Sequence, residues 1–242
     1  SDLSGNVAII PIKGVIVSQK EKGNLFDRTT SATEVIKFIE KAEEKAHVKA
    51  IVFEINSPGG SPVASDEIGS AIKLVEKPVV ALIREAGASG GYWIASAADY
   101  IIANKMSITG SIGVVSSYLE FSGFMEKYGI GYEQLTAGKY KDVGTPFRKL
   151  QEEERDLMQR KLNKVHSFFV QEITENRNLP KDEVEEIATG EFFFGVEALE
   201  NGLVDELGDL KSAEKYIITN SELTEVDFAT YKTEVGIFDA LT

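Results

Sequence analysis

The stretch VVALIREAGASGGYWIASAA, residues 79–98, passes from an apolar run into a segment of small residues and then into a second apolar stretch. Val79 to Ile83 has the length and composition of a buried strand. The glycines and serines that follow predict a turn, and an apolar helix is expected to end near Ala98. A strand that leads through such a turn into a helix is the repeating unit of parallel α/β sheets.

The same alternation precedes this stretch. Val7 to Ile12 reads as a buried strand, residues 31–46 as a helix, Ala50 to Ile55 as a strand, and residues 62–76 as a helix. The helix over 31–46 carries an apolar face opposite its lysines and glutamates, formed by Ala32, Val35, Ile36, Ile39 and Ala42. We therefore expect an α/β fold with a mostly parallel sheet and helices packed against it.

The second half of the chain is more helical. Short strands are predicted at Tyr100 to Ala103, Ile112 to Ser116 and Gly131 to Leu135. Residues 151–177 predict one long amphipathic helix, because apolar side chains recur along it at helical spacing. Two short helices and a last strand near Val226 to Tyr231 complete the chain.

No internal repeat, low-complexity tract or linker interrupts the sequence, so we expect a single domain over residues 1–242. Within it, residues 1–150 would form the α/β core that carries any site, and residues 151–242 a helical and C-terminal extension.

Composition excludes several classes of function. The net charge of −13 and the pI near 4.8 argue against nucleic acid or an anionic membrane surface as a partner. The chain has no cysteine, which excludes disulfides and thiolate metal sites. Because His47 and His166 are the only histidines, a histidine-based zinc centre is not expected, and we predict neither metal nor cofactor.

The sequence contains no apolar run of the roughly 18 to 20 residues that a membrane span needs, and no secretory signal. The start at Ser1 leaves open that an anchor was removed.

Two glycine-rich turns could carry chemistry. Asn56-Ser57-Pro58-Gly59-Gly60 follows a predicted buried strand, and paired glycines let backbone N–H groups face a ligand or a developing oxyanion. In Gly87-Ala88-Ser89-Gly90-Gly91, a serine is flanked by residues with little side chain, so a peptide carbonyl could approach its hydroxyl. Taken singly, the first is better explained by an ordinary strand-to-helix turn and the second by a helix cap.

Two later segments are polar within otherwise ordinary loops. Thr109-Gly110-Ser111-Ile112-Gly113 places a serine between glycines, and Gly138-Lys139-Tyr140-Lys141-Asp142 carries two lysines. By spacing alone, Ser111 is a turn hydroxyl and the lysines are solvated.

Together, these four segments closely resemble the signal peptide peptidase A family of serine–lysine peptidases related to protease IV. The pairing of Ala-Ser-Gly-Gly-Tyr at 88–92 with Thr-Gly-Ser-Ile-Gly at 109–113 carries the resemblance, which extends from about Val7 to Leu210. Residues 190–207 resemble the closing segment of the family. The resemblance is to the single-domain branch, and it implies a crotonase/Clp-protease-like spiral of strand–helix units.

The resemblance also implies roles for individual residues. Ser89 would be the nucleophile, Lys141 the general base, and Ser111 the group that holds the lysine amine. Backbone N–H groups of Gly59 and Gly90 would form the oxyanion hole, with Gly60 as the alternative to Gly59. Substrate contacts are expected at Gly60, Ile112 and Val114, with Val63 beside them.

At the level of the whole protein, the resemblance implies an endopeptidase that cleaves hydrophobic peptides such as signal-peptide remnants through an acyl-enzyme. It further implies a homo-oligomeric ring. Membrane association would come only through a segment outside this chain, with the catalytic domain on the extracytoplasmic side.

A lysine base imposes physical conditions on its site. A free lysine has a pKa of about 10.4, and lowering it by ~3 units disfavours the charged form by about 4 kcal/mol. That requires a dry pocket without a paired carboxylate. We therefore expect Lys141 to be buried and, in an extended segment, Asp142 to point away from it while Lys139 shares its face.

Two other functions remain open. A crotonase-like enzyme acting on acyl-CoA thioesters would share the fold, but it needs acids in the pocket and a nucleotide site, and no phosphate-binding glycine motif occurs around these loops. A ring scaffold that binds peptides without cutting them is the other alternative, although the presence of Ser89, Ser111 and Lys141 argues against it.

Overall fold

The computed structural model describes residues 4–20 and 29–232. The chain divides into two compact units, residues 1–113 with 169–242, and residues 114–168, which we call unit 1 and unit 2. Neither boundary coincides with residue 150, where we expected the core to end, because the chain returns to unit 1 within a helix.

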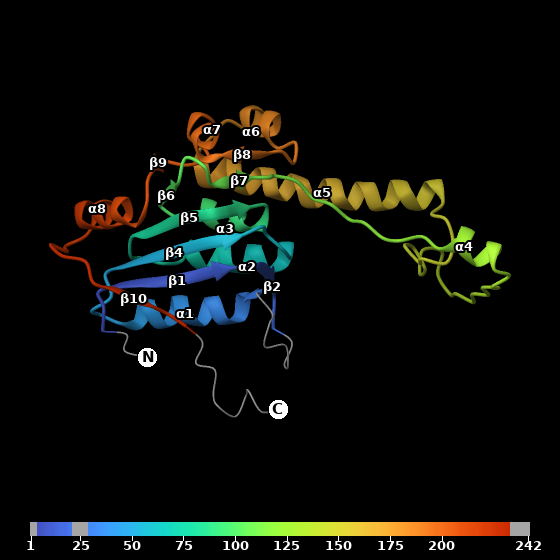
Figure 1. Cartoon of the computed structure of the whole chain (residues 1–242), viewed down its shortest axis with the longest axis horizontal. Helices are drawn as coiled ribbons and strands as arrows, with labels where there is room; N and C mark the ends of the chain where they lie inside the picture. Colours follow the sequence, from blue (N-terminus) through green and yellow to red (C-terminus); the bar gives the residue numbers. More distant parts are fainter. Residues whose placement is uncertain (1–3, 21–28, 233–242) are drawn as a thin grey trace, which may run out of the picture. The chain divides into compact units, whose positions relative to one another are not determined.

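Unit 1 is built on an eight-stranded sheet with the order β10-β1-β4-β5-β6-β9, in which β7 pairs with β5 and β8 with β7 (Figure 1). The strands are β1 (Val7–Lys13), β4 (Ala50–Ser57), β5 (Val79–Ala88), β6 (Tyr100–Ala103), β7 (Ile108–Gly110), β8 (Phe192–Phe194), β9 (Glu206–Leu207) and β10 (Phe228–Thr230). Every pairing is parallel except that of β7 with β8, which confirms the mostly parallel sheet.

The two faces of this sheet are covered differently. One face packs on α1 (Ala32–Glu44), α2 (Pro62–Ile72), α3 (Gly90–Ser96) and the last residues of α5 (Glu152–Arg177), in a large apolar cluster. The other face packs on α8 (Leu210–Asn220), through Ala213 and Ile217 (Figure 1). Because both faces are covered, the central strands are apolar on both sides, as parallel strands usually are.

The apolar face predicted for the first helix is nearly correct. Ala32, Val35, Ile39 and Ala42 are buried, and Ile36 is half-buried. After α5, the chain forms α6 (Lys181–Ile187), α7 (Gly195–Glu200) and α8, where we expected two helices. None of the helices in the described ranges is long and apolar enough to cross a membrane.

Two short strands lie outside the main sheet. β2 (Val15–Val17) and β3 (Thr29–Ser31) pair in parallel, and Ile16 of β2 forms a further parallel bridge with Gly60. The sequence did not predict these strands, since each has only three residues and depends on its partner.

The strands predicted at 112–116 and 131–135 are wrong. Neither segment is paired in the structure, and the regular elements that lie in unit 2 are α4 (Ser122–Lys127) and most of α5. Alternating apolar residues form a strand only where a partner ladder and a buried face exist, and in unit 2 the only buried residue is Glu154.

Candidate active site

The glycine-rich turns of unit 1 follow neighbouring parallel strands. Ser57 at the end of β4 pairs with Gly87, and Ala88 at the end of β5 pairs with Gly110 at the end of β7. The carboxyl ends of parallel strands meet at one edge of the sheet, which is where open α/β sheets bind ligands. The structure therefore brings the turn at 57–60, Ser89 and Ser111 to the same edge.

Ser89 has an unusual backbone conformation, with φ 52° and ψ −123°. Its N–H donates to the Gly110 carbonyl at 2.8 Å, and its carbonyl accepts from the N–H groups of Tyr92 and Trp93, both at 2.9 Å. Its side chain makes no capping hydrogen bond to α3, which argues against the helix-cap interpretation. A serine held at positive φ on a sharp strand-to-helix turn, with its hydroxyl unused, is the arrangement of an exposed nucleophile.

The residues around Ser89 leave no room for side chains. A Cβ on Gly59, which has φ +102°, would lie 2.7 Å from the Gly90 nitrogen and 2.9 Å from the Ser89 Cβ. A Cβ on Gly90 would lie 2.3 Å from the Ser65 Oγ. Glycine is thus required at 59 chiefly by close backbone contact and at 90 chiefly by the Ser65 side chain, and both glycines bring the turn after β4 directly against the serine.

The two glycine amides of the first turn differ. The buried Gly59 donates its N–H to the Ser57 Oγ at 3.0 Å. Gly60 is exposed, its nitrogen would lie 3.3 Å from a Cβ on Gly90, and its N–H has no hydrogen-bond partner among the residues that the structure describes. The geometry thus favours Gly60 over Gly59 as the free donor.

Ser111 follows β7 as Ser89 follows β5. It too has a positive φ, of 50°, and its N–H donates to the Glu191 carbonyl at 2.8 Å. Its hydroxyl donates to the Gly190 carbonyl at 3.3 Å. The Ser111 hydroxyl therefore has a backbone partner in this structure, and its oxygen can still accept a hydrogen bond from another group.

The residues expected to contact substrate have different environments. The Ile112 side chain is fully buried in the apolar cluster, so it cannot line an open pocket, which corrects our expectation. Val114 is half-buried and Val63 is 61% exposed. Ile112 was misassigned because its apolar side chain is used for the core.

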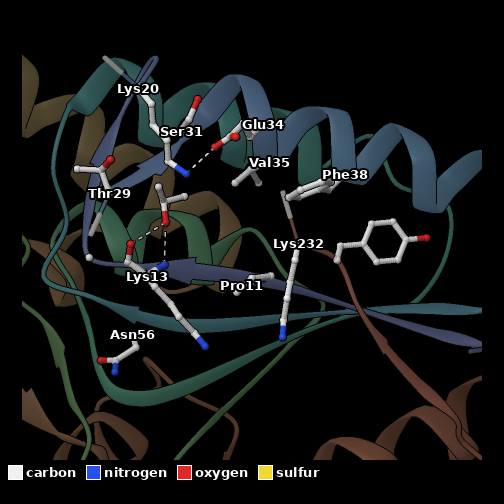
Figure 2. Close-up of a pocket in the computed structure, with 13 residues that line it drawn as sticks. Pro11, Lys13, Lys20, Thr29, Ser31, Glu34, Val35, Phe38, Asn56 and Lys232 are labelled. Carbon is white, nitrogen blue, oxygen red and sulfur yellow. Dashed lines mark hydrogen bonds and ion pairs between the residues drawn. The ribbon is translucent and has the colours of Figure 1, made fainter. Parts of the chain in front are cut away.

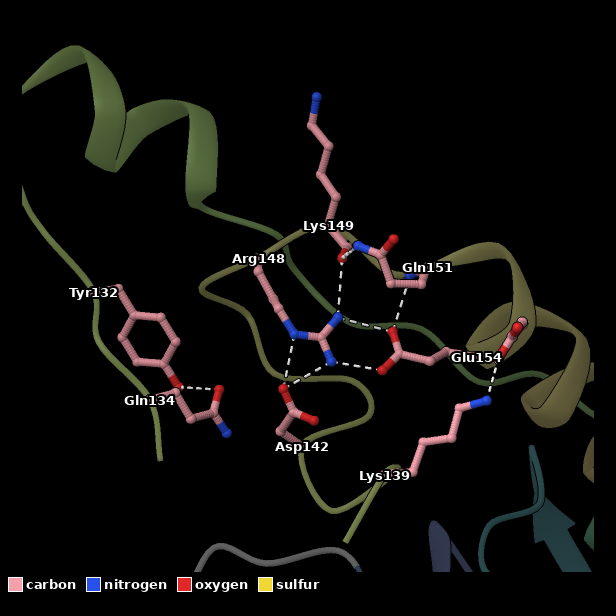
Figure 3. A network of polar contacts seen from close by, with 9 residues as sticks. Tyr132, Gln134, Lys139, Asp142, Arg148, Lys149, Gln151 and Glu154 are labelled. Atoms are coloured by element: carbon pink, nitrogen blue, oxygen red, sulfur yellow. Dashed lines mark hydrogen bonds and ion pairs between the residues drawn. The ribbon is translucent and has the colours of Figure 1, made fainter. Parts of the chain in front are cut away.

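The lysine-bearing segment lies in unit 2 and is a turn, not the extended segment that we expected. Asp142 forms an ion pair with Arg148, whose Nη2 lies 2.7 Å from the Asp142 carboxylate (Figure 3). The hydrogen bond from Arg148 holds the pKa of Asp142 below its usual value. Asp142 is thus engaged by an arginine and not by the Lys141 amine.

Arg148 also binds Glu154 with both terminal nitrogens, at 2.8 and 2.6 Å (Figure 3). The Glu154 carboxylate accepts in addition from the Gln151 N–H at 2.9 Å. These hydrogen bonds, first that from Arg148, lower the pKa of Glu154 to about 2. Arg148 therefore ties the turn at 142 to the first turn of α5.

Neither lysine of the turn meets our expectation. Lys139 pairs with Glu153 at 2.5 Å, which raises the pKa of Lys139 and offsets its charge. Lys141 is exposed, so the dry environment expected for it is not present in this structure. Within the described part of the chain, Lys141 has no carboxylate partner.

A cavity of about 670 Å³, which the sequence did not indicate, lies between β1, β3 and α1 (Figure 2). Lys13, Lys20 and Lys232 line it. Lys20 forms an ion pair with Glu34 and Lys13 with Glu54, each at 2.8 Å, so the charges of two of the three lysines that line the cavity are neutralised. No cluster of three or more histidine, aspartate or glutamate residues able to hold a metal occurs in residues 4–20 and 29–232.

Comparison with known proteins gives consistent matches. The profile of Peptidase family S49 matches residues 71–224, and that of Clp protease matches residues 24–110. Both agree with the resemblance noted in the sequence and with a crotonase/Clp-protease-like α/β fold.

Individual relatives cover most of the chain. A protein of Enterococcus faecium, provisionally named signal peptide peptidase SppA, is 34% identical over 95% of this chain and 67% of its own length. A provisionally named protease of Methanocaldococcus jannaschii is 35% identical over 84% of this chain and 67% of its own length. The chloroplastic serine protease SPPA of Arabidopsis thaliana is 35% identical over 86% of this chain, which spans only 31% of that protein.

Proposed function

Because this chain belongs to peptidase family S49, which makes it a serine protease, we propose that it cleaves peptides with Ser89 as nucleophile and Lys141 as general base. The observation that carries the assignment of Ser89 is its strained turn, with an uncommitted hydroxyl against Gly59 and Gly90. Lys141 is assigned by resemblance and by elimination, since Lys139 is paired with Glu153, whereas Lys141 has no carboxylate partner among residues 4–20 and 29–232.

In the proposed reaction, the neutral Lys141 amine takes the proton of the Ser89 hydroxyl as Oγ bonds to the substrate carbonyl carbon. The C–N bond then breaks, Lys141 returns the proton to the leaving amine, and the acyl group stays on Ser89. Water then gives a proton to Lys141 and bonds to the ester carbonyl carbon; the bond to Ser89 Oγ breaks, Lys141 returns the proton to Oγ, and the acid is released. The proposal requires Lys141 to leave solvent when it meets the serine, and Ser111 would then accept a hydrogen bond from the amine.

The oxyanion of the tetrahedral intermediate would be held by two backbone N–H groups. We assign them to Gly60 and Gly90, because the Gly59 N–H is already taken by Ser57. Donors of this kind, fixed before the reaction, are worth about 10²- to 10³-fold in turnover.

The substrate class proposed is an extended hydrophobic peptide, such as a signal-peptide remnant. Val63, which is exposed, and Val114, which is half-buried, are the apolar side chains proposed to contact such a peptide. Assembly into a homo-oligomeric ring and an extracytoplasmic, membrane-anchored location rest on the family resemblance alone. Light scattering on the purified chain tests the first, and a single subunit mass would contradict it.

The central test compares alanine variants with a matched control. Ser89→Ala and Lys141→Ala should each abolish cleavage of a hydrophobic reporter peptide, whereas Lys139→Ala, two residues away, should retain it. A fluorophosphonate probe should label Ser89 in the wild-type protein. Labelling without cleavage would favour the peptide-binding scaffold, and activity in Lys141→Ala would remove the lysine from the mechanism.

The pH profile gives a second test. Turnover should climb from neutral to alkaline pH, because only an unprotonated amine can accept the serine proton. Initial rates at saturating peptide between about pH 6 and about pH 9 measure this. A flat profile over that range would contradict a lysine base.

A further inference from the structure

Ser57 is a buried polar residue whose hydroxyl connects three backbone segments. It is the last residue of β4, and its side chain has no exposed area. The hydroxyl donates to the Gly14 carbonyl at 2.6 Å and accepts from the Gly59 N–H at 3.0 Å. The Ser57 side chain therefore binds the turn after β4 to Gly14, the residue before β2, and also joins the two ends of the turn, Ser57 and Gly59.

Other hydrogen bonds also hold this turn, but none of those that follow engages the Gly59 N–H. The pairing of β4 with β5 shifts register between Ile55 and Ser57, and the Asn56 side chain accepts the Ala86 N–H at 3.2 Å across that irregularity. Beyond it, Ile16 donates its N–H to the Gly59 carbonyl at 3.0 Å, and Ser61 donates to the Ile16 carbonyl at 2.8 Å. These bonds hold the backbone on both sides of Gly60, but none of them engages the Gly59 N–H.

Without the Ser57 hydroxyl, the Gly59 N–H would be a buried donor with no partner. A buried unpaired N–H is unfavourable, so the peptide between Pro58 and Gly59 would be expected to turn toward another acceptor. Gly59 is packed so closely against Ser89 and Gly90 that only a hydrogen fits between them. If the Pro58–Gly59 peptide rotated, the next peptide, between Gly59 and Gly60, would therefore be displaced as well. The orientation of the Gly60 N–H thus depends on two bonds made by Gly59: its carbonyl, in the same peptide unit, accepts from Ile16, and its N–H donates to the Ser57 hydroxyl.

We propose that Ser57 is a positioning residue that selects the oxyanion donor: by binding the Gly59 N–H, it leaves the Gly60 N–H facing the nucleophile. This inference rests on the proposed function, since it concerns the amide that would stabilise the charge formed when Ser89 attacks. Ser57 itself touches neither the substrate nor the reacting atoms.

The chain supplies a matched control. Ser107 is 2% exposed and, like Ser57, accepts one backbone N–H, that of Asn104 at 3.0 Å. Its hydroxyl donates to backbone carbonyls of one neighbouring strand, those of Arg84 and, at 3.3 Å, Ile83. Ser57→Ala and Ser107→Ala therefore remove the same kind of side chain from the same kind of environment. Only the first is expected to affect the developing oxyanion.

The experiment measures kcat, KM and inhibition by a peptide aldehyde, whose adduct places an oxyanion in the same position. Ser57→Ala should lower kcat by about 100-fold and weaken the aldehyde by a similar factor, with KM changed less than about threefold. Ser107→Ala should keep kcat within about threefold of wild type. The alkaline rise of the pH profile should keep its midpoint in both variants, because neither serine contacts the base.

A second pair of variants covers the case in which Ser57→Ala does not fold. Threonine and valine have nearly the same shape, so Ser57→Thr and Ser57→Val differ chiefly in the hydroxyl, and the threonine variant should be at least about tenfold more active. Equal activity of that pair, or a kcat near wild type in Ser57→Ala, would overturn the proposal. Failure of the proposed function would be seen separately, as cleavage that survives in Ser89→Ala.

Discussion

The serine-bearing turn of unit 1 and the lysine-bearing turn of unit 2 are held in place by different kinds of interaction. Ser89 is fixed by backbone hydrogen bonds to Gly110, Tyr92 and Trp93, and by glycines whose hydrogens are the only atoms that fit. The turn that carries Lys141 is held by the side chain of Arg148, through Asp142 and Glu154. The proposed nucleophile thus depends on steric fit, and the proposed base depends on surface ion pairs.

The two turns should therefore respond differently to salt, to pH and to substitution. Close backbone packing is insensitive to salt and moderate pH, but it tolerates no added atom. Ion pairs near the surface are screened by salt and are lost when a partner is neutralised, yet they tolerate substitution of neighbouring residues. We expect the lysine-bearing turn to be the part of the site that solution conditions alter first.

Among variants that test this comparison, the largest effect is predicted for Gly90→Ala, which probes the steric half. Its new Cβ would lie 2.3 Å from the Ser65 Oγ and 3.3 Å from the Gly60 nitrogen. We expect turnover to fall by about 1000-fold, because both proposed oxyanion donors are displaced, and stability to fall by about 1–3 kcal/mol. Peptide-cleavage rates and thermal unfolding of the purified variant measure the two quantities.

Two further variants isolate the cause. Gly131→Ala, where a Cβ meets nothing within 4 Å, should leave both quantities unchanged. Adding Ser65→Ala to Gly90→Ala removes the nearest clashing atom and should recover part of the stability. If Gly90→Ala alone were fully active, the claim that steric fit holds Ser89 would be wrong.

A smaller effect is predicted for Arg148→Ala, which tests the electrostatic half. It leaves Asp142 and the buried Glu154 without their arginine, so the turn at 142 should loosen and turnover should fall by about tenfold. Arg155, an exposed arginine that follows Glu154 in α5, supplies the control: Arg155→Ala should retain activity. Susceptibility of residues 138–156 to limited proteolysis measures the loosening directly.

The pH dependence of this network follows from the lowered pKa of Glu154, about 2 in the folded chain. A carboxyl whose folded pKa lies below its unfolded value of about 4.3 stabilises the fold fully above that value and loses its contribution as pH falls toward 2. In Arg148→Ala, a carboxyl NMR titration should show the midpoint of Glu154 move upward. An unchanged midpoint would mean that Arg148 does not set it.

The same contrast explains how far the sequence predicted the structure. β1, β4, β5 and β6 were found because apolar runs bounded by turns are decided by local composition. β5 nevertheless continues beyond the predicted end at Ile83, to Ala88, directly before Ser89. β7 was missed because a three-residue strand is defined by its pairing with Gly87 and Ala88. The turn at Lys141 was taken as extended, since nothing in its sequence shows that Arg148 binds Asp142.

Within the candidate site, the sequence could name the glycines but could not choose between them. Gly59 and Gly60 have the same chemistry and adjacent positions, and only the hydrogen bond from Gly59 to Ser57 distinguishes them. Ile112 was expected to contact substrate because its motif is near the serine, but its side chain packs into the core. The direction in which a side chain points after the end of a strand is decided by tertiary packing, and the residues of a motif do not reveal that packing.

The smallest effect is predicted for Tyr92→Phe, which asks whether the far side of α3 also holds Ser89. The buried Tyr92 hydroxyl donates to the Leu203 carbonyl at 2.8 Å, and burial raises the pKa of Tyr92, so it remains a donor at alkaline pH. Losing this bond should lower the free energy of unfolding by about 1 kcal/mol. Turnover should change little, because the Tyr92 N–H still binds the Ser89 carbonyl. Denaturant unfolding and kcat measured beside Tyr100→Phe decide the matter: a large loss of turnover at nearly unchanged stability would show that the serine needs this distant anchor.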